Sequence, residues 1–418
     1  MIFILLNLVI ITSNTLLFSF QKSENQVNDF IEDLLYSSIY TNISIGNPEQ
    51  IIEMNIKLEN YQTFISGSNI ESHNYNEKKS KSFQNTSEKF EDSSRENLEE
   101  GFICYETFTF TNYKNKKNKY EKFPFALTTK INNLKELNIL GLNLYDTNLS
   151  NIPNFLKSLK SNNIIEERIF YFEINKDNLN IGKLTIGNYP HEIEPNNYNI
   201  KNLLNLNPKF SSFTFEWDIR LDKIYSGNER FISCSNDAKL RIELGVFVGS
   251  FYYEDFIYRN YFDKLIQNKK CGIFSLKNKY KYYSCDNDIQ INNFPDLYFY
   301  NKDNNFSFVF NYEDLFYKNK NKIYFLVVFK EKETHYWVLG RPLFKKYKLI
   351  FNSERRIISF YSIYGNDSYK PNIWINLLLF LLFLIIIILV IYLIYYLKNK
   401  PKKLYAKELT EELNIKIF

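Results

Sequence analysis

Residues 40–57 read YTNISIGNPEQIIEMNIK, and this stretch says most about the fold. Tyr40–Ile45 and Ile51–Lys57 each alternate in part between apolar and polar side chains, which is typical of half-buried β-strands. Phe102–Phe110 (FICYETFTF) repeats the pattern. Aromatic residues make up 18% of the chain, and flat aromatic side chains suit a pleated sheet. We therefore predict a mainly β protein with a few short helices.

Two strand-rich halves follow from this pattern. We place the first half at residues 35–190 and the second at residues 210–363, joined by a polar stretch that contains prolines. Residues 71–100 are rich in Ser, Asn, Lys and Glu, so we predict a mobile, low-complexity surface insertion there. One helix is expected at Ile152–Ser161, with a proline in its first turn. Each half contains a strand with polar residues and, later, two hydrophobic residues followed by glycine.

Both ends of the chain are apolar. Residues 1–20 lack acidic side chains and fit a secretory signal peptide, with an uncleaved membrane anchor as the alternative. Residues 373–397 are long enough to span a bilayer as one helix. Lysines follow at once in residues 398–418, and the positive-inside rule puts this tail in the cytosol. We expect a single-pass type I protein of the secretory pathway or plasma membrane, with its large domain lumenal or extracellular.

The cysteines and sequons agree with that location. Cys271 and Cys285 would close a short disulfide loop in an oxidising compartment, whereas Cys104 and Cys234 have no evident local partner. Five N-x-S/T sequons predict glycosylation: Asn42, Asn85, Asn148, Asn305 and Asn366. With three histidines and no CxxC spacing, we expect neither a metal nor a cofactor. The net charge of +5 is spread out, so we expect no nucleic-acid partner.

Six short motifs together resemble the pepsin family of aspartic proteases (peptidase family A1), over residues 35–363. They are Tyr40–Gln50, Tyr105 within FICYETFTF, Asn138–Leu142 (NILGL), Gly182–Gly187 (GKLTIG), Trp217–Ile224 (WDIRLDKI) and Trp337–Phe344 (WVLGRPLF). The resemblance implies a bilobal double β-barrel with a deep cleft and, with the apolar segment, a C-terminal transmembrane helix. It also implies that Tyr105 is the tyrosine of the flap over the cleft. Membrane-anchored relatives exist among the memapsins and the plasmepsins.

The family's chemistry requires two aspartates, one from each lobe, which share a proton because both cannot ionise so close together. Each begins an Asp-Thr/Ser-Gly triplet. Here the positions that match are Lys57-Leu58-Glu59 and Glu243-Leu244-Gly245. Arg341 also replaces an acidic residue after the second hydrophobic turn, and Glu106 replaces the glycine after Tyr105. The resemblance therefore implies a degenerate dyad of Lys57 and Glu243.

A lysine cannot share a proton with a carboxylate as an aspartate does. If Lys57 and Glu243 face each other, we expect an ion pair that lowers the pKa of Glu243 and keeps it ionised. We also expect Leu58 and Leu244 to pack together. A competing register pairs Glu59 with Glu243 and restores two carboxylates, because Glu59 lies on the same strand face as Lys57.

Three functions remain open at this point. The first is an inactive pseudoprotease, which we expect to be a monomer and to bind an extended peptide or protein in its cleft through backbone hydrogen bonds. The second is an active aspartic endopeptidase with an atypical centre at Glu59 and Glu243. The third is a structural or adhesive surface protein.

Overall fold

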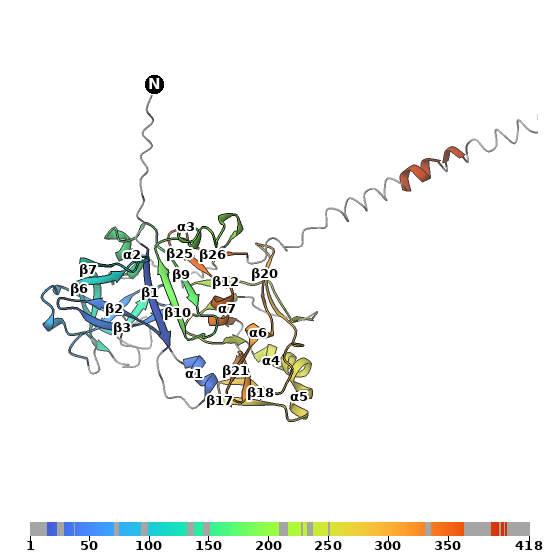
Figure 1. Cartoon of the computed structure of the whole chain (residues 1–418), viewed down its shortest axis with the longest axis horizontal. Coiled ribbons are helices and arrows are strands. Elements are labelled where there is room, and N and C mark those ends of the chain that lie inside the picture. The colour runs from blue at the N-terminus through green and yellow to red at the C-terminus, as the bar shows by residue number, and fades with distance from the viewer. Residues whose placement is uncertain are drawn as a thin grey trace, which may run out of the picture. The chain divides into compact units, whose positions relative to one another are not determined.

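The computed structural model divides the chain into two units, residues 1–363 and residues 364–418. It describes residues 15–22, 29–36, 38–70, 75–92, 99–131, 138–144, 151–208, 216–226, 229–231, 237–249, 251–330, 336–362, 386–392, 394–396 and 398. The first unit is mainly β, as the sequence predicted (Figure 1). Its strands form a central sheet, a first lobe and a second lobe.

The central sheet joins the two ends of the first unit. Its six strands run in the order β11-β26-β25-β9-β10-β1. They are β1 (Leu16–Lys22), β9 (Ile169–Ile174), β10 (Ile181–Ile186), β11 (Leu203–Leu206), β25 (Ile350–Asn352) and β26 (Ile357–Tyr361). Phe170 of β9 stacks on Phe351 of β25 with ring centroids 4.8 Å apart. Strands that are remote in sequence therefore share one hydrophobic layer.

The first lobe is a closed barrel of six strands, in the cyclic order β2-β3-β8-β4-β7-β6 and back to β2. The strands are β2 (Ile39–Ile45), β3 (Gln50–Lys57), β4 (Thr63–Ser66), β6 (Glu99–Thr111), β7 (Lys117–Ile131) and β8 (Ile139–Gly141). An additional strand, β5 (Gln84–Asp92), pairs with β6. Closure removes free edges from the six barrel strands, whereas β5 is the terminal strand of the sheet.

The second lobe contains two sheets. The larger has the path β12-β15-β24-β16-β23-β18-β22-β21, with β17 paired to β18. Its strands are β12 (Asp218–Arg220), β15 (Asp237–Leu240), β16 (Phe247–Gly249), β17 (Cys271–Leu276), β18 (Tyr280–Asp286), β21 (Phe316–Asn319), β22 (Lys322–Phe325), β23 (Val327–Lys330) and β24 (Trp337–Leu339). The smaller sheet contains β13 (Lys223–Ser226), β14 (Glu229–Phe231), β19 (Leu297–Asn301) and β20 (Phe306–Phe310). The described pairings thus show one closed barrel, not two.

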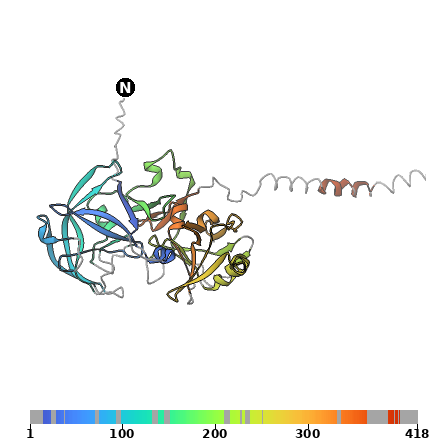
Figure 2. The ribbon, with the colours of Figure 1, turned by 60° about the horizontal axis from the view of Figure 1, so that its bottom comes forward.

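Short helices cover the strand ends. They are α1 (Phe30–Tyr36), α2 (Phe155–Ser161), α3 (Pro190–Ile193), α4 (Phe251–Ile257), α5 (Asp263–Gln267), α6 (Tyr312–Leu315) and α7 (Arg341–Lys346), with single turns at η1 (Glu77–Lys79), η2 (Ile200–Asn202) and η3 (Tyr258–Phe262). Figure 2 shows α1, in blue, beside the second lobe. Phe30 of α1 stacks on Tyr317 of β21 at 5.2 Å. The predicted helix at Ile152–Ser161 corresponds to α2.

The structure corrects the predicted mobile insertion at residues 71–100. Within it, Tyr75 is fully buried against Phe83 and Phe125, and residues 84–92 form β5. The polar composition misled the prediction because β5 is an outer strand, in which residues 84–89 and 91 are exposed. Residues 71–74 and 93–98 lie outside the described part of the chain.

The structure also conflicts with the predicted end of the signal peptide at Phe20. Residues 16–20 form most of β1, which lies between β10 and β2. Leu16, Phe18 and Phe20 are at most 5% exposed. Burying such side chains contributes roughly 1.5–3 kcal/mol each. The folded domain therefore begins earlier than residue 35, where the sequence placed it.

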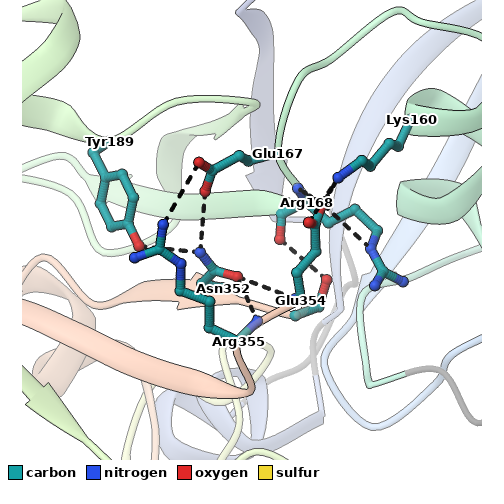
Figure 3. Close-up of polar contacts among 8 residues, drawn as sticks. Lys160, Glu167, Arg168, Tyr189, Asn352, Glu354 and Arg355 are labelled. Atoms are coloured by element: carbon teal, nitrogen blue, oxygen red, sulfur yellow. Dashed lines mark hydrogen bonds and ion pairs between the residues drawn. The ribbon is translucent and has the colours of Figure 1, made fainter.

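A polar cluster ties the last strands to the first lobe (Figure 3). Glu354, just after β25, accepts hydrogen bonds from the Lys160 Nζ of α2 at 2.6 Å and from the Arg168 backbone at 2.9 Å. Asn352 is fully buried and donates to the Tyr189 hydroxyl at 3.1 Å. Burial raises the pKa of Glu354, but these hydrogen-bond donors lower it by more, so the net shift is downward. The cluster fixes the return of the chain from the second lobe to the central sheet.

Most of the predicted transmembrane segment, residues 373–397, lies outside the described residues. The described part is helical at residues 386–392 and 394–396. Among the residues that the structure describes, no helix combines the length and the apolar character needed to cross a membrane.

Candidate site at the junction of the two lobes

The two lobes repeat one crossing of strands. In the first lobe, β8 lies between β3, with which it is parallel, and β4, with which it is antiparallel. In the second lobe, β24 lies in the same way between β15 and β16. In each crossing one loop connects the two outer strands, β3 to β4 in the first lobe and β15 to β16 in the second. These loops, residues 58–62 and 241–246, carry the candidate site.

Matching the two crossings shows which residues are equivalent. Lys57 pairs with Gly141, and Leu240 pairs with Leu339, directly before Gly340. A Cβ at Gly141 would lie 2.2 Å from the Gln62 carbonyl oxygen, and a Cβ at Gly340 would lie 2.3 Å from that of Val246. Gln62 and Val246 are therefore equivalent. The residues five positions before them are Lys57 and Arg241, which the strand pairs also make equivalent.

This alignment corrects the predicted second triplet. The equivalent of Lys57-Leu58-Glu59 is Arg241-Ile242-Glu243, not Glu243-Leu244-Gly245. Glu243 is thus equivalent to Glu59, two residues beyond the position expected for a catalytic aspartate. The sequence analysis missed Arg241. The repeat of cation, branched aliphatic residue and glutamate (KLE and RIE) was the signal that could have revealed it.

The charged residues of the two loops interact across the lobes. The Arg241 Nε lies 3.3 Å from a Glu59 carboxylate oxygen and 3.8 Å from a Glu243 oxygen. The charge of Lys57 acts on Glu243, whose pKa it lowers. Each lobe therefore presents its cation to the glutamate of the other lobe. Glu216 completes the group, since it accepts hydrogen bonds from Arg241 at 2.9 Å and Lys239 at 2.8 Å.

The pKa of Glu243 is shifted in the direction opposite to the expectation. Its side chain is 11% exposed, and its Oε2 has no hydrogen-bond partner among the described residues. Burial raises the pKa of Glu243, while Lys57 and Arg241 oppose this effect and Glu59 adds to it. The net direction is upward, so the prediction that the ion pair lowers this pKa overall was wrong. It omitted the cost of removing a carboxylate from water.

Arg341 is a second buried charge at the site. It begins α7, is fully buried, and its three guanidinium nitrogens have no hydrogen-bond partner among the described residues. Burial lowers its pKa to about 10, although Glu243 and Asp33 favour the charged form. The equivalent residue of the first lobe is Leu142, which is also fully buried. The second lobe thus carries a charge where the first carries a hydrocarbon.

Aliphatic residues alternate with these charges along the two loops. Leu58 and Ile242 are fully buried, and Leu244 packs against the same hydrophobic cluster. The α1 helix covers the second loop, because Gly245 donates its backbone N–H to the Leu34 carbonyl at 2.8 Å. Trp217 joins the lobes, since its Nε1 donates to the Leu142 carbonyl at 3.0 Å.

The structure does not place Tyr105 at the tip of a flap. It lies in the middle of β6, paired with Gln84 of β5 and Pro124 of β7. A hairpin does approach the site at Asp92, the last residue of β5, which accepts a hydrogen bond from Gln62 at 2.7 Å. The neighbouring Glu106 is buried and accepts a hydrogen bond from the Tyr75 hydroxyl at 2.5 Å. Tyr105 and Glu106 therefore belong to the barrel wall.

The Cys271–Cys285 disulfide is confirmed, and it links β17 to β18. Cys104 is a free, buried thiol whose pKa burial raises to about 12. Cys234 lies outside the described residues. Among the sequons, Asn42, Asn85 and Asn305 are exposed, while Asn148 and Asn366 are not in the described part of the chain.

The lobes, the crossed strands and the loops at their junction define a pepsin-like domain. A model of the eukaryotic aspartyl protease family matches residues 38–363. The chain therefore belongs to the eukaryotic aspartyl protease family. Among curated proteins, the search found no match to this chain.

Proposed function

We propose that this protein is a membrane-anchored pseudoprotease that binds an extended peptide or protein segment without cleaving it. The observation that carries the proposal is the pair of equivalent positions Lys57 and Arg241. An aspartic protease needs two carboxyls there that share one proton. Two cations can neither share that proton nor take one from water at the pH where such enzymes work.

The alternative centre at Glu59 and Glu243 has less support. Both glutamates interact with the same cation, since the Arg241 Nε lies 3.3 Å from a Glu59 oxygen and 3.8 Å from a Glu243 oxygen. Glu59 is 40% exposed and Glu243 is 11% exposed, so water solvates them very differently. A guanidinium that interacts with both carboxylates offsets the repulsion between them, and this repulsion is what enforces proton-sharing in an aspartate pair.

The fold supports the proposal of peptide binding, because strand-like ligands bind sheets through main-chain hydrogen bonds that need no catalytic dyad. Anchoring rests on the apolar residues 373–397 and the lysines after them. The described part of that segment is helical with exposed apolar side chains, among them Ile388 and Ile391. A structural or adhesive protein remains the other non-catalytic reading.

A retention experiment tests this function. The full chain in detergent is immobilised and exposed to a mixed peptide library, and retained peptides are eluted and identified by mass spectrometry. We expect a subset of extended, apolar peptides to be enriched and recovered intact. If no peptide is enriched over a matrix without protein, the binding function is wrong and an adhesive role gains support. Recovery of fragments alone would instead indicate catalysis.

A further inference from the structure

We propose that the chain is processed between Thr15 and Leu16, so that the mature protein begins with β1. The proposal concerns the junction between the apolar N-terminal segment and the folded domain. It rests on the entry into the secretory pathway that the proposed function requires, and it adds the site at which the leader is removed.

The first step is the position of β1 within the sheet. One edge pairs with β10 from Leu16↔Ile186 to Gln21↔Ile181, and the other pairs with β2 at Phe20↔Thr41. The Thr41 hydroxyl donates to the Ser19 carbonyl at 2.8 Å. Removal of residues up to Phe20 would leave the facing edges of β10 and β2 unpaired inside the domain.

The second step is the fit of the β1 side chains. Phe18 packs edge-on against Phe110 and Phe155, with ring centroids 6.0 and 6.1 Å away. Phe20 lies over Gly182 of β10, where a Cβ would stand 2.4 Å from the phenylalanine ring. The glycine makes room for this ring, so β10 is adapted to the presence of Phe20.

The third step is the chemistry of leader removal. Leader peptidases cut after small residues at the first and third positions before the cleaved bond, behind an apolar run of 7–15 residues. Ser13-Asn14-Thr15 places Ser13 and Thr15 at these positions, and residues 2–11 supply the apolar run. A cut after Phe20 would place Phe18 and Phe20 at these two positions, where the peptidase requires small side chains.

These observations select the same bond. A cut after Thr15 leaves β1 whole, from Leu16 to Lys22. It gives up the hydrogen bond from the Thr15 hydroxyl to Asn188 at 3.0 Å and that from the Tyr113 backbone to the Thr15 carbonyl at 2.9 Å. The peptide bond is hydrolysed by water, and Leu16 gains a free amino group at the start of the strand.

The experiment is to express the full chain in eukaryotic cells, purify it from membranes and determine its N-terminus by sequencing and intact mass. Glycosidase treatment in parallel reports entry into the secretory pathway, because Asn85 and Asn305 are exposed sequons. We expect a glycosylated chain that begins at Leu16. A glycosylated chain that keeps Met1, or that begins after Phe20, would overturn the processing site. An unglycosylated chain that keeps Met1 would refute the secretory entry itself.

Variants make the test specific. Ser13→Phe and Thr15→Phe each put a bulky side chain at a position that the peptidase reads, so we expect loss of the Leu16 N-terminus. Ser19→Phe is the matched control, since Ser19 is an exposed β1 residue beyond the site, and we expect unchanged processing. Normal processing of both Ser13→Phe and Thr15→Phe would contradict the proposal. The Ser13 variant remains informative if Thr15→Phe disturbs the fold.

Discussion

The loops after β3 and β15 begin with the same residue types in the same order, yet their charged side chains differ in burial. In the first lobe Glu59 is 40% exposed, and the hydrophobic turn ends in Leu142. In the second lobe Glu243 is 11% exposed, and the turn ends in the fully buried Arg341. The comparison teaches that the second lobe buries more charged groups at this junction than the first. Arg241 of the second lobe also forms an ion pair with Glu59 of the first.

Removal of Arg241 should produce the largest effect, because its side chain interacts with Glu59, Glu216 and Glu243. We expect Arg241→Ala to lower the free energy of unfolding by about 3–5 kcal/mol, since it leaves buried carboxylates uncompensated. Denaturant unfolding measures this. The control is Arg259→Ala, because Arg259 and its partner Asp255 are both solvent-exposed, and the expected loss is below about 1 kcal/mol. Equal losses for both variants would show that the crossed pairs are not a structural centre.

The disulfide gives a second difference, since the described cysteines of the first lobe form none. Cys271 and Cys285 are separated by 14 residues. We expect the double serine variant to lose about 3 kcal/mol of stability, because the unfolded chain regains the freedom of that loop. Wild-type protein in reductant should unfold at the same denaturant concentration as the variant. A variant as stable as the oxidised wild type would contradict this expectation.

Replacing Arg341 with the residue type of the first lobe should stabilise the protein. Arg341→Leu removes a buried guanidinium that has no hydrogen-bond partner among the described residues. We expect a gain of about 1–4 kcal/mol in the free energy of unfolding, as for other buried charges that are replaced by hydrocarbon. Arg341→Lys keeps a charge at this position and should give no gain. A clear loss of stability in Arg341→Leu would mean that Glu243 needs this cation.

The buried Glu243 and the half-buried Glu216 should respond to pH in opposite directions. Burial raises the pKa of Glu243, so its contribution to stability is present below its ordinary pKa and is lost as the pH rises. Burial also raises the pKa of Glu216, but hydrogen bonds from Lys239 and Arg241 lower it by more, so its net shift is downward. Its contribution is therefore present above its ordinary pKa and is lost as the pH falls.

Glutamine variants measure this contrast. Relative to wild type, Glu243→Gln should gain stability as the pH rises from about 4 to 7, and Glu216→Gln should lose it, each on the order of 1 kcal/mol. Denaturant unfolding at several pH values gives both slopes. Parallel slopes would show that the two carboxyls share one environment, which contradicts the opposite directions in which their pKa values are shifted.

The sequence predicted the family, the strand-rich halves, α2 and the disulfide, because each depends on a local pattern or a short spacing. It misplaced the second triplet, since KLE and RIE become equivalent only when the strand crossings are compared. It missed the packing of Tyr75 and the place of β1, because composition and apolar length do not show which neighbours a segment finds. The raised pKa of Glu243 depends on its burial, which arises only when segments remote in sequence meet, as α1 does where Leu34 accepts a hydrogen bond from Gly245.

The central claim is that cations have replaced the proton-sharing pair, and a digestion experiment tests it most directly. The purified full chain is incubated with a peptide library between about pH 4 and 7, with and without pepstatin, beside a Glu59→Gln/Glu243→Gln variant. We predict no cleavage above that of the variant at any pH. Pepstatin-sensitive cleavage that disappears in the double variant would contradict the account and establish a glutamate-based active site.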